Sequence, residues 1–135
     1  MSFQFQSDDN GYSMIELLVV ILIIGILAAI ALPTFLGHQA KAQDSEAKAN
    51  ARNAIALVES CYVESKDYTD CDTAAELDKT PLTIVSGNPG NGGEVGFSPA
   101  STSNTYAIKA KSKSGNTFTI AKNSAGVLSR SCTGS

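Results

Sequence analysis

A single acidic residue, Glu16, stands at the start of an apolar segment that runs without interruption from Leu17 to Leu32. An ionised carboxylate inside hydrocarbon costs about 2.5 to 3.5 kcal/mol on insertion scales, so such a residue normally has a partner or a function. No Lys or Arg lies near Glu16 in the sequence. A cut between Gly11 and Tyr12 would create a positive α-amine four residues away. That amine would be the nearest positive group available to Glu16.

The apolar segment is long enough to cross a membrane. At ~1.5 Å per residue, a helix over residues 12–36 exceeds the ~30 Å thickness of bilayer hydrocarbon. A cleaved secretory signal peptide is the alternative. It fits poorly because the segment is long, no Lys or Arg precedes it, and no small-x-small site closes it. Apolar side chains and glycine in this segment are interrupted only by Ser13, Glu16, Pro33 and Thr34.

The stretch GYSMIELLVV, residues 11–20, resembles the amino-terminal signature of type IV prepilins and of the related pseudopilins of type II secretion. The signature combines a Gly at the cleavage position, an aromatic first mature residue, a Glu four residues later and a long apolar helix. Gly25 and Pro33 stand at the offsets typical of the family. The resemblance implies that a prepilin peptidase of the inner membrane cuts after Gly11 and methylates the new amine of Tyr12. Phe is commoner than Tyr at that position.

The resemblance, which covers about residues 11–45, implies three parts for the chain. These are a leader peptide at 1–11, a transmembrane and assembly helix at 12–36, and a pilin globular domain at 37–135. The 135 residues leave room for one small domain beside the apolar helix. The formal net charge of -3 gives the chain as a whole no basic surface for nucleic acid.

The charges that flank the apolar segment oppose its expected orientation. Residues 1–11 contain two aspartates and no Lys or Arg, whereas Lys41, Lys48 and Arg52 follow the segment. By the positive-inside tendency this balance would orient the body toward the cytoplasm, and prepilin leaders usually carry basic residues. Two explanations compete: the targeting machinery overrides the charge bias, or translation begins at an upstream start.

Helical periodicity continues beyond the apolar segment, with apolar residues at three- and four-residue intervals and charged residues on other faces. We expect one helix over about residues 13–63, roughly 75 Å long, whose first half protrudes and whose second half packs on a folded body. Gly25 and Pro33 weaken the first half. They are either tolerated membrane-helix kinks or, as the resemblance implies, the limits of a segment that melts during assembly. The apolar residues are Ala40, Ala47, Ala51, Ala54, Ile55, Val58, Cys61 and Tyr62, and the charged residues are Lys41, Asp44, Glu46, Lys48, Arg52 and Glu59.

After a loop at 64–80, residues 81–132 show the patterns of strands and turns. The Gly/Asn/Pro-rich stretch 86–93 predicts a loose hairpin loop between the first two strands, and Ser114-Gly115-Asn116 predicts a tight turn between the next two. The expected strands lie at 82–85, 94–97, 106–111, 117–120 and near 127–131.

These elements predict an α+β fold, the pilin fold. The amphipathic half of the long helix is expected to cover the apolar face of a roughly four-stranded antiparallel sheet, because the sheet alone would have too little core. The residues expected on that face are Ile84, Phe97, Tyr106, Ile108, Phe118 and Ile120.

Three cysteines allow at most one internal disulfide and leave one thiol. A body outside the cytoplasm would permit oxidation. Pairing of Cys61 with Cys71 is favoured, and the pairs that use Cys132 remain alternatives. The cysteines do not form a zinc set, because no Cys-x-x-Cys occurs and the single histidine, His38, adjoins the apolar segment. We expect no metal and no cofactor.

Catalysis finds little support, since the chain has one histidine, no nucleophile elbow and no phosphate loop. An acidic run could bind calcium, but it lacks the spacing of a ligand loop and is better explained as a solvated loop. Four lysines on the predicted hairpin could contact DNA, although solvation or edge protection is the ordinary explanation. The acidic run is Asp67, Asp70, Asp72, Glu76 and Asp78, and the lysines are Lys109, Lys111, Lys113 and Lys122.

The resemblance implies a structural subunit of a type IV pilus that serves adhesion, motility or DNA uptake, and not an enzyme. Such a subunit is a single-pass precursor in the inner membrane, and an assembly platform and motor then polymerise it into a homo-oligomeric filament at the cell surface. In the filament Glu16 would neutralise the Tyr12 amine of a neighbouring subunit, which offsets the cost of burying either charge. The alternatives are a type II secretion pseudopilin, a minor DNA-binding pilin, and a membrane-anchored surface domain that does not assemble.

Overall fold

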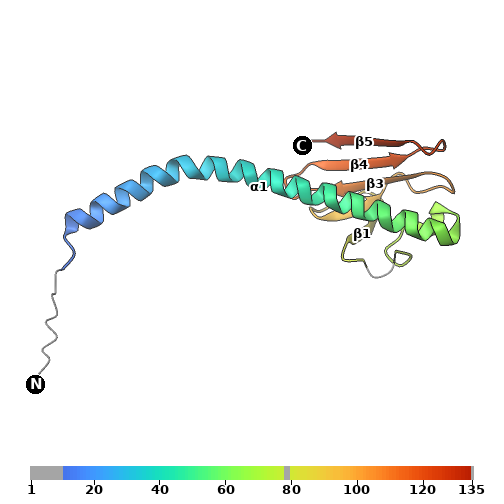
Figure 1. Ribbon diagram of the computed structural model, residues 1–135, viewed down its shortest axis with the longest axis horizontal. Helices are drawn as coiled ribbons and strands as arrows, with labels where there is room; N and C mark the ends of the chain where they lie inside the picture. Colours follow the sequence, from blue (N-terminus) through green and yellow to red (C-terminus); the bar gives the residue numbers. More distant parts are fainter. Residues whose placement is uncertain (1–10, 78–79, 135) are drawn as a thin grey trace, which may run out of the picture. The chain divides into compact units, whose positions relative to one another are not determined.

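The computed structural model describes residues 11–77 and 80–134 of the chain (Figure 1). The first ten residues of the expected leader lie outside the described residues, and so does Asp78. The chain divides into two compact units, one that ends at Gly37 and one that begins at His38. The elements in chain order are α1 (Met14–Ser65), η1 (Tyr68–Cys71), β1 (Thr83–Ser86), β2 (Glu94–Phe97), β3 (Tyr106–Lys111), β4 (Thr117–Lys122) and β5 (Leu128–Thr133).

The predicted long helix and the α+β class are confirmed. Helix α1 has 52 residues and includes Pro33 in its interior. Proline has no amide hydrogen, so the carbonyl of Ala29 loses its helical donor. Two residues before Pro33, the carbonyl of Ala31 accepts a second hydrogen bond, from the Thr34 hydroxyl at 2.9 Å. Despite this lost hydrogen bond, α1 continues through Pro33 instead of ending at it.

The first unit presents its apolar side chains to the outside. Among residues 11–37, only Ala28 is even partly buried within the chain. Leu18 is 60% exposed and Ile24 is 59% exposed. In the part of the chain that the structure describes, α1 is the one helix long and apolar enough to cross a membrane.

In the second unit, α1 supplies a stripe of small residues to the core. Ala51, Ala54 and Val58 are fully buried and pack with the apolar face of the sheet. The predicted sheet face is confirmed, because side chains alternate along a strand and place Tyr106 and Ile108 on the same side. The remaining members of that face are Phe97, Phe118 and Ile120, which are buried, and Ile84, which is partly buried.

The sheet differs from the predicted one in strand number and in one pairing. It has five strands in the order β1-β2-β3-β4-β5, and the neighbouring pairs from β2 onward are antiparallel. Strand β1 runs parallel to β2, with Thr83 opposite Glu94 and Ser86 opposite Phe97. The predicted hairpin between these two strands is therefore wrong, and the sheet has one strand more than the roughly four expected.

The connection between β1 and β2 explains the parallel pairing. A Cβ atom on Gly96 would clash with the carbonyl of Gly87, so the glycine lets the connection lie directly on β2. The Glu94 carboxylate holds the returning chain by accepting hydrogen bonds from the amides of Gly90 and Asn91, each at 2.8 Å. The Gly/Asn/Pro composition indicated a turn but carried no information about the direction in which the second strand leaves it.

The predicted loop after the helix contains a short 3-10 helix, which a disulfide ties to α1. Asp67 caps η1 by accepting a hydrogen bond from the amide of Thr69 at 2.9 Å. Cys61 and Cys71 form the disulfide, with their Cα atoms 5.9 Å apart. This selects the favoured pairing among the alternatives, and Cys132 is a free, exposed thiol on β5.

Candidate processing and assembly site

Glu16 has a local partner at the start of α1 that the sequence analysis did not predict. Its Oε2 accepts a hydrogen bond from the Ser13 amide at 3.2 Å, and the Ser13 Oγ accepts one from the Ile15 amide at 3.2 Å. This arrangement resembles the reciprocal capping box, which provides acceptors for amides left free at a helix start. The signal was readable, because Ser-x-x-Glu before an apolar run is a typical helix start. The carboxylate also lies at the positive end of the helix dipole.

The bond between Gly11 and Tyr12 lies in a non-helical segment that precedes α1. Tyr12 is 82% exposed, and a Cβ atom on Gly11 would meet no atom of residues 11–77 and 80–134 within 4 Å. The described part of the fold therefore places no steric requirement for glycine at this position.

Gly25 lies in a shallow apolar hollow on the surface of α1. Among the described residues, a Cβ atom there would also meet nothing within 4 Å, so their packing does not require the glycine. A lipid or a second subunit is the remaining source of a close contact. The residues that line the hollow with Gly25 are Leu18, Ile21, Leu22, Ile26 and Ala29.

A polar cluster in the second unit links α1, η1, β3 and β4. The Glu59 carboxylate accepts hydrogen bonds from the hydroxyls of Tyr68 and Tyr106, each at 3.0 Å, and from Lys122 Nζ at 2.9 Å. Lys122 also donates to the Tyr68 oxygen at 2.6 Å. Burial acts to raise the pKa of Glu59, but the hydrogen bonds, above all that from Lys122, outweigh it and lower the pKa. The cluster therefore favours the ionised carboxylate.

Two sequence-based placements are corrected by this cluster. Glu59 was placed among the charged residues away from the packed face of α1, yet it joins the helix to the sheet. Lys122 was grouped with lysines that could contact DNA. It lies on the same side of β4 as Phe118 and Ile120, because alternate residues of a strand share a face, and it turns toward the helix.

Asp44 makes a second polar link between α1 and the sheet. It accepts hydrogen bonds from the Ser114 hydroxyl and, at 2.9 Å, from Asn116 Nδ2. The hydrogen bonds, first that from Ser114, lower the pKa of Asp44 against the opposing effect of burial. Ser114 and Asn116 belong to the tight turn between β3 and β4, and the predicted hairpin there is confirmed.

The other lysines of the predicted hairpin lie apart from Lys122. Lys109 Nζ donates to Asn88 Oδ1 at 2.8 Å, and Lys113 Nζ lies 3.8 Å from Glu46 Oε1 in an exposed ion pair. In the acidic run, Glu76 accepts hydrogen bonds from the nearby amides of Asp72 and Thr73, and Asp72 accepts one from the distant Ser101 amide. Within residues 11–77 and 80–134, no three His, Cys, Asp or Glu side chains are grouped as metal ligands.

Comparison with known proteins bears on the amino-terminal segment and on the body. The sequence profile of the prokaryotic N-terminal methylation motif matches residues 6–32. The type IV major fimbrial protein FimA of Dichelobacter nodosus is 29% identical over 131 residues, which cover 91% of this chain and 79% of the relative. The type IV major pilin protein PilA of Myxococcus xanthus is 42% identical over 67 residues, which cover 50% of this chain.

A third relative, the type IV major pilin protein PilE1 of Neisseria gonorrhoeae, is 38% identical over 75 residues, or 56% of this chain. The matches extend over 30% of the Myxococcus protein and 46% of the Neisseria protein, so the chain spans less than half of either. No solved structure gave a significant match.

Proposed function

Because this chain belongs to the type IV pilin family, as its methylation motif and its relatives show, we propose that it is a structural, non-enzymatic subunit of a type IV pilus. The observation that carries the proposal is the exposure of the apolar half of α1 directly after the processing motif. A helix with this surface needs either lipid or other helices around it. A subunit stored in a membrane and later polymerised meets both environments in turn. The relatives are named as pilins and fimbrial proteins, which favours a pilus over the alternatives.

Processing is the first step of the proposed function. A prepilin peptidase of the inner membrane cuts after Gly11, removes residues 1–11 and methylates the amine of Tyr12. The exposed, non-helical peptide around this bond supports the assignment, because a peptidase requires an extended and accessible substrate. The mature subunit then waits as a single-pass membrane protein with its body outside the cytoplasm.

Assembly is the second step. A platform and motor extract the subunit, and apolar helices of many copies bundle to replace the lipid. In the bundle, Glu16 pairs with the Tyr12 amine of a neighbour, which offsets the desolvation of both charges. The same carboxylate accepts a hydrogen bond from its own Ser13 amide, so the helix start holds the acid in place for this pairing. Gly25 and Pro33 are the assigned weak points of the helix during the transfer.

Substitutions at Glu16 test the assembly step. Glu16→Gln keeps the hydrogen-bond acceptor of the capping box but removes the charge, whereas Ser13→Ala removes the capping hydroxyl and leaves the charge. We expect both Glu16→Gln and Glu16→Ala to be cleaved and poorly assembled, and Ser13→Ala to assemble. The measurement is the yield of sheared filaments beside the amount of processed subunit in the membrane. Normal filament yield from Glu16→Gln would remove the charge from the mechanism.

The mature amino terminus tests the function as a whole. Mass spectrometry of the cellular protein is expected to find a chain that begins at a methylated Tyr12. Electron microscopy of a deletion strain, with and without the restored gene, is expected to show filaments only when the gene is present. A chain that retains Met1 in cells without filaments would contradict the proposal.

A further inference from the structure

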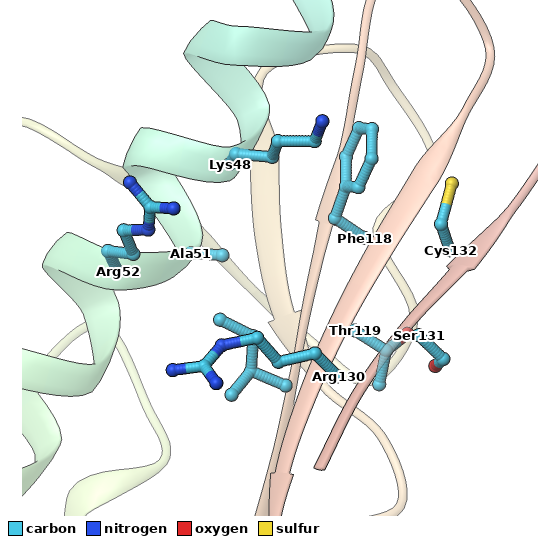
Figure 2. Close-up of a pocket in the computed structure, with 9 residues that line it drawn as sticks. Lys48, Ala51, Arg52, Phe118, Thr119, Arg130, Ser131 and Cys132 are labelled. Carbon is cyan, nitrogen blue, oxygen red and sulfur yellow. The ribbon is translucent and has the colours of Figure 1, made fainter. Parts of the chain in front are cut away.

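A basic hollow opens on one flank of α1, between the helix and strand β5. Its floor is formed by Phe118 and Ile120, and its rim carries Lys48 and Arg52 from α1 and Arg130 from β5. The hollow has a volume of about 440 Å³. Figure 2 shows Lys48 extending over Phe118, and Arg130 extending from β5 toward the helix.

The three cations of the basic hollow are available for a partner. Within residues 11–77 and 80–134, the ion pairs are Lys113 with Glu46 and Lys122 with Glu59, so none of the three takes part in one. Lys48 lies 4.9 Å from the centre of the Phe118 ring and helps to lower the pKa of Asp44 one helical turn away. Arg52 and Arg130 are exposed, and no described acidic side chain lines the hollow with them. A chain with a net charge of -3 therefore gathers three cations here that form no ion pair within the described residues.

An acidic hollow lies on another flank of the same helix. Its rim carries the exposed carboxylates of Glu64 and Glu76. The other lining residues are the polar Ser60 and the apolar Leu57, Cys61 and Leu77. Its volume is about 220 Å³. Glu76 accepts hydrogen bonds from the amides of Asp72 and Thr73 through Oε2, whereas Oε1 accepts none within residues 11–77 and 80–134.

The two hollows face different directions from the helix axis. At about 100° per residue, Lys48 and Arg52 lie on one side of the buried alanine stripe, whereas Ser60 and Glu64 lie on the other. A copy of the chain can therefore offer its basic hollow to one neighbour and its acidic hollow to another. In such a head-to-tail contact, two copies that are joined still have one free hollow of each kind. Further copies can therefore add, and the product is a ring or an open helical polymer.

We propose that the basic hollow of Lys48, Arg52 and Arg130 receives the acidic rim of Glu64 and Glu76 from a second copy of this chain. This inference rests on the proposed function and names a contact between subunit bodies within the filament. The hollows are centred about ten residues apart on α1, so paired neighbours are offset along the helix by roughly 15 Å. We choose a second copy as the occupant because the same chain carries both surfaces, and their charges are complementary. Both hollows also lie beside the same helix, α1.

A charge-reversal experiment in a deletion strain tests the contact. Arg52→Glu combined with Arg130→Glu is expected to lower the yield of sheared filaments about tenfold or more, because like charges then meet at the interface. Adding Glu64→Lys and Glu76→Lys to the same chain is expected to restore the yield to within about twofold of the unmodified protein. The thermal unfolding of each processed subunit in detergent verifies that the body is folded.

The matched control is Lys109→Glu combined with Lys111→Glu, which makes the same change in net charge on the sheet face that lines neither hollow. This control is expected to assemble normally.

Equal losses in the control and in the Arg52/Arg130 variant, or no rescue by the lysine substitutions, would overturn the inference. The Arg52/Arg130 variant could also keep its filament yield while its purified filaments bind less duplex DNA. That result would assign the basic hollow to nucleic acid and would overturn the inference. Absence of filaments from the unmodified protein would instead contradict the proposed function.

Discussion

The segment Met14–Gly37 and the body from His38 onward belong to one chain but obtain their stability from different sources. In the first, Leu18 and Ile24 are more than half exposed. In the second, Val95 and Ile108 are fully buried. The body contains its own core, a disulfide and two polar links between helix and sheet. The apolar segment therefore depends on surrounding molecules, whereas the body depends on its own contacts, and substitutions should separate the two.

The largest effect is expected at the processing position. If the proposed peptidase cuts after Gly11, Gly11→Trp should lower cleavage at least about tenfold, because an indole ring would replace a hydrogen atom at the cleavage position, whereas Gly11→Ala should retain more processing. Gly11 precedes α1, and among the described residues a Cβ atom on it meets nothing within 4 Å, so the folded body should be unaffected. Mass spectrometry of the membrane fraction measures precursor and mature forms. Unchanged processing of Gly11→Trp would remove Gly11 from the cleavage site.

The next effect belongs to the body alone. Replacing Cys61 and Cys71 together by alanine should lower the free energy of unfolding by about 2–4 kcal/mol, because the loop that they close gains freedom in the unfolded chain. Denaturant unfolding of the full-length protein in detergent, followed by tyrosine fluorescence, provides the measurement. Cys132→Ala is the control and should change the value by less than about 0.5 kcal/mol. An equal loss in the control would assign the stabilising bond to Cys132 and contradict the observed pairing.

A pH dependence should follow from the polar links of the body. The pKa values of Glu59 and Asp44 are lowered by folding, so the stability that they contribute is present above their unfolded values near 4 and is lost as the pH falls through the folded values. Glu59→Gln should cost about 1 kcal/mol at neutral pH and flatten the acid part of the profile. Combination with Asp44→Asn should flatten it further. A profile of unchanged slope in the double variant would exclude these two carboxylates as its source.

The smallest effect on the body is expected from Gly25→Ala. The substitution improves local helix propensity by about 1 kcal/mol, and its Cβ atom meets nothing within 4 Å in the described part of the chain, so the unfolding of the body should be unchanged. Filament yield should nevertheless fall about threefold, since small residues allow apolar helices to approach closely. Gly37→Ala is the matched control, because a Cβ atom there also meets nothing within 4 Å. Equal filament yields from the two variants would remove the role of Gly25 in helix packing.

The sequence was informative where near neighbours decide the structure. The helix, its alanine stripe and the turn at Ser114–Asn116 were predicted because each depends on residues a few positions apart. The capping pair of Ser13 and Glu16 has an equally local signal, a Ser-x-x-Glu pattern before an apolar run. Gly96 shows what the sequence could not predict. This position requires glycine because the fold places the Gly87 carbonyl directly against it.

By itself the sequence determined the match to the N-terminal methylation motif and the long helix with its two kinds of surface, because spacing along the chain carries that information. Tertiary structure decided the direction of β1 beside β2, the inward placement of Lys122 against Glu59 and the choice of Cys71 as partner of Cys61. It also gathered Arg130 with Arg52 at one hollow and Glu64 with Glu76 at another. These features join segments distant in sequence, and the packing of helix on sheet, rather than local preference, determines which side chains meet.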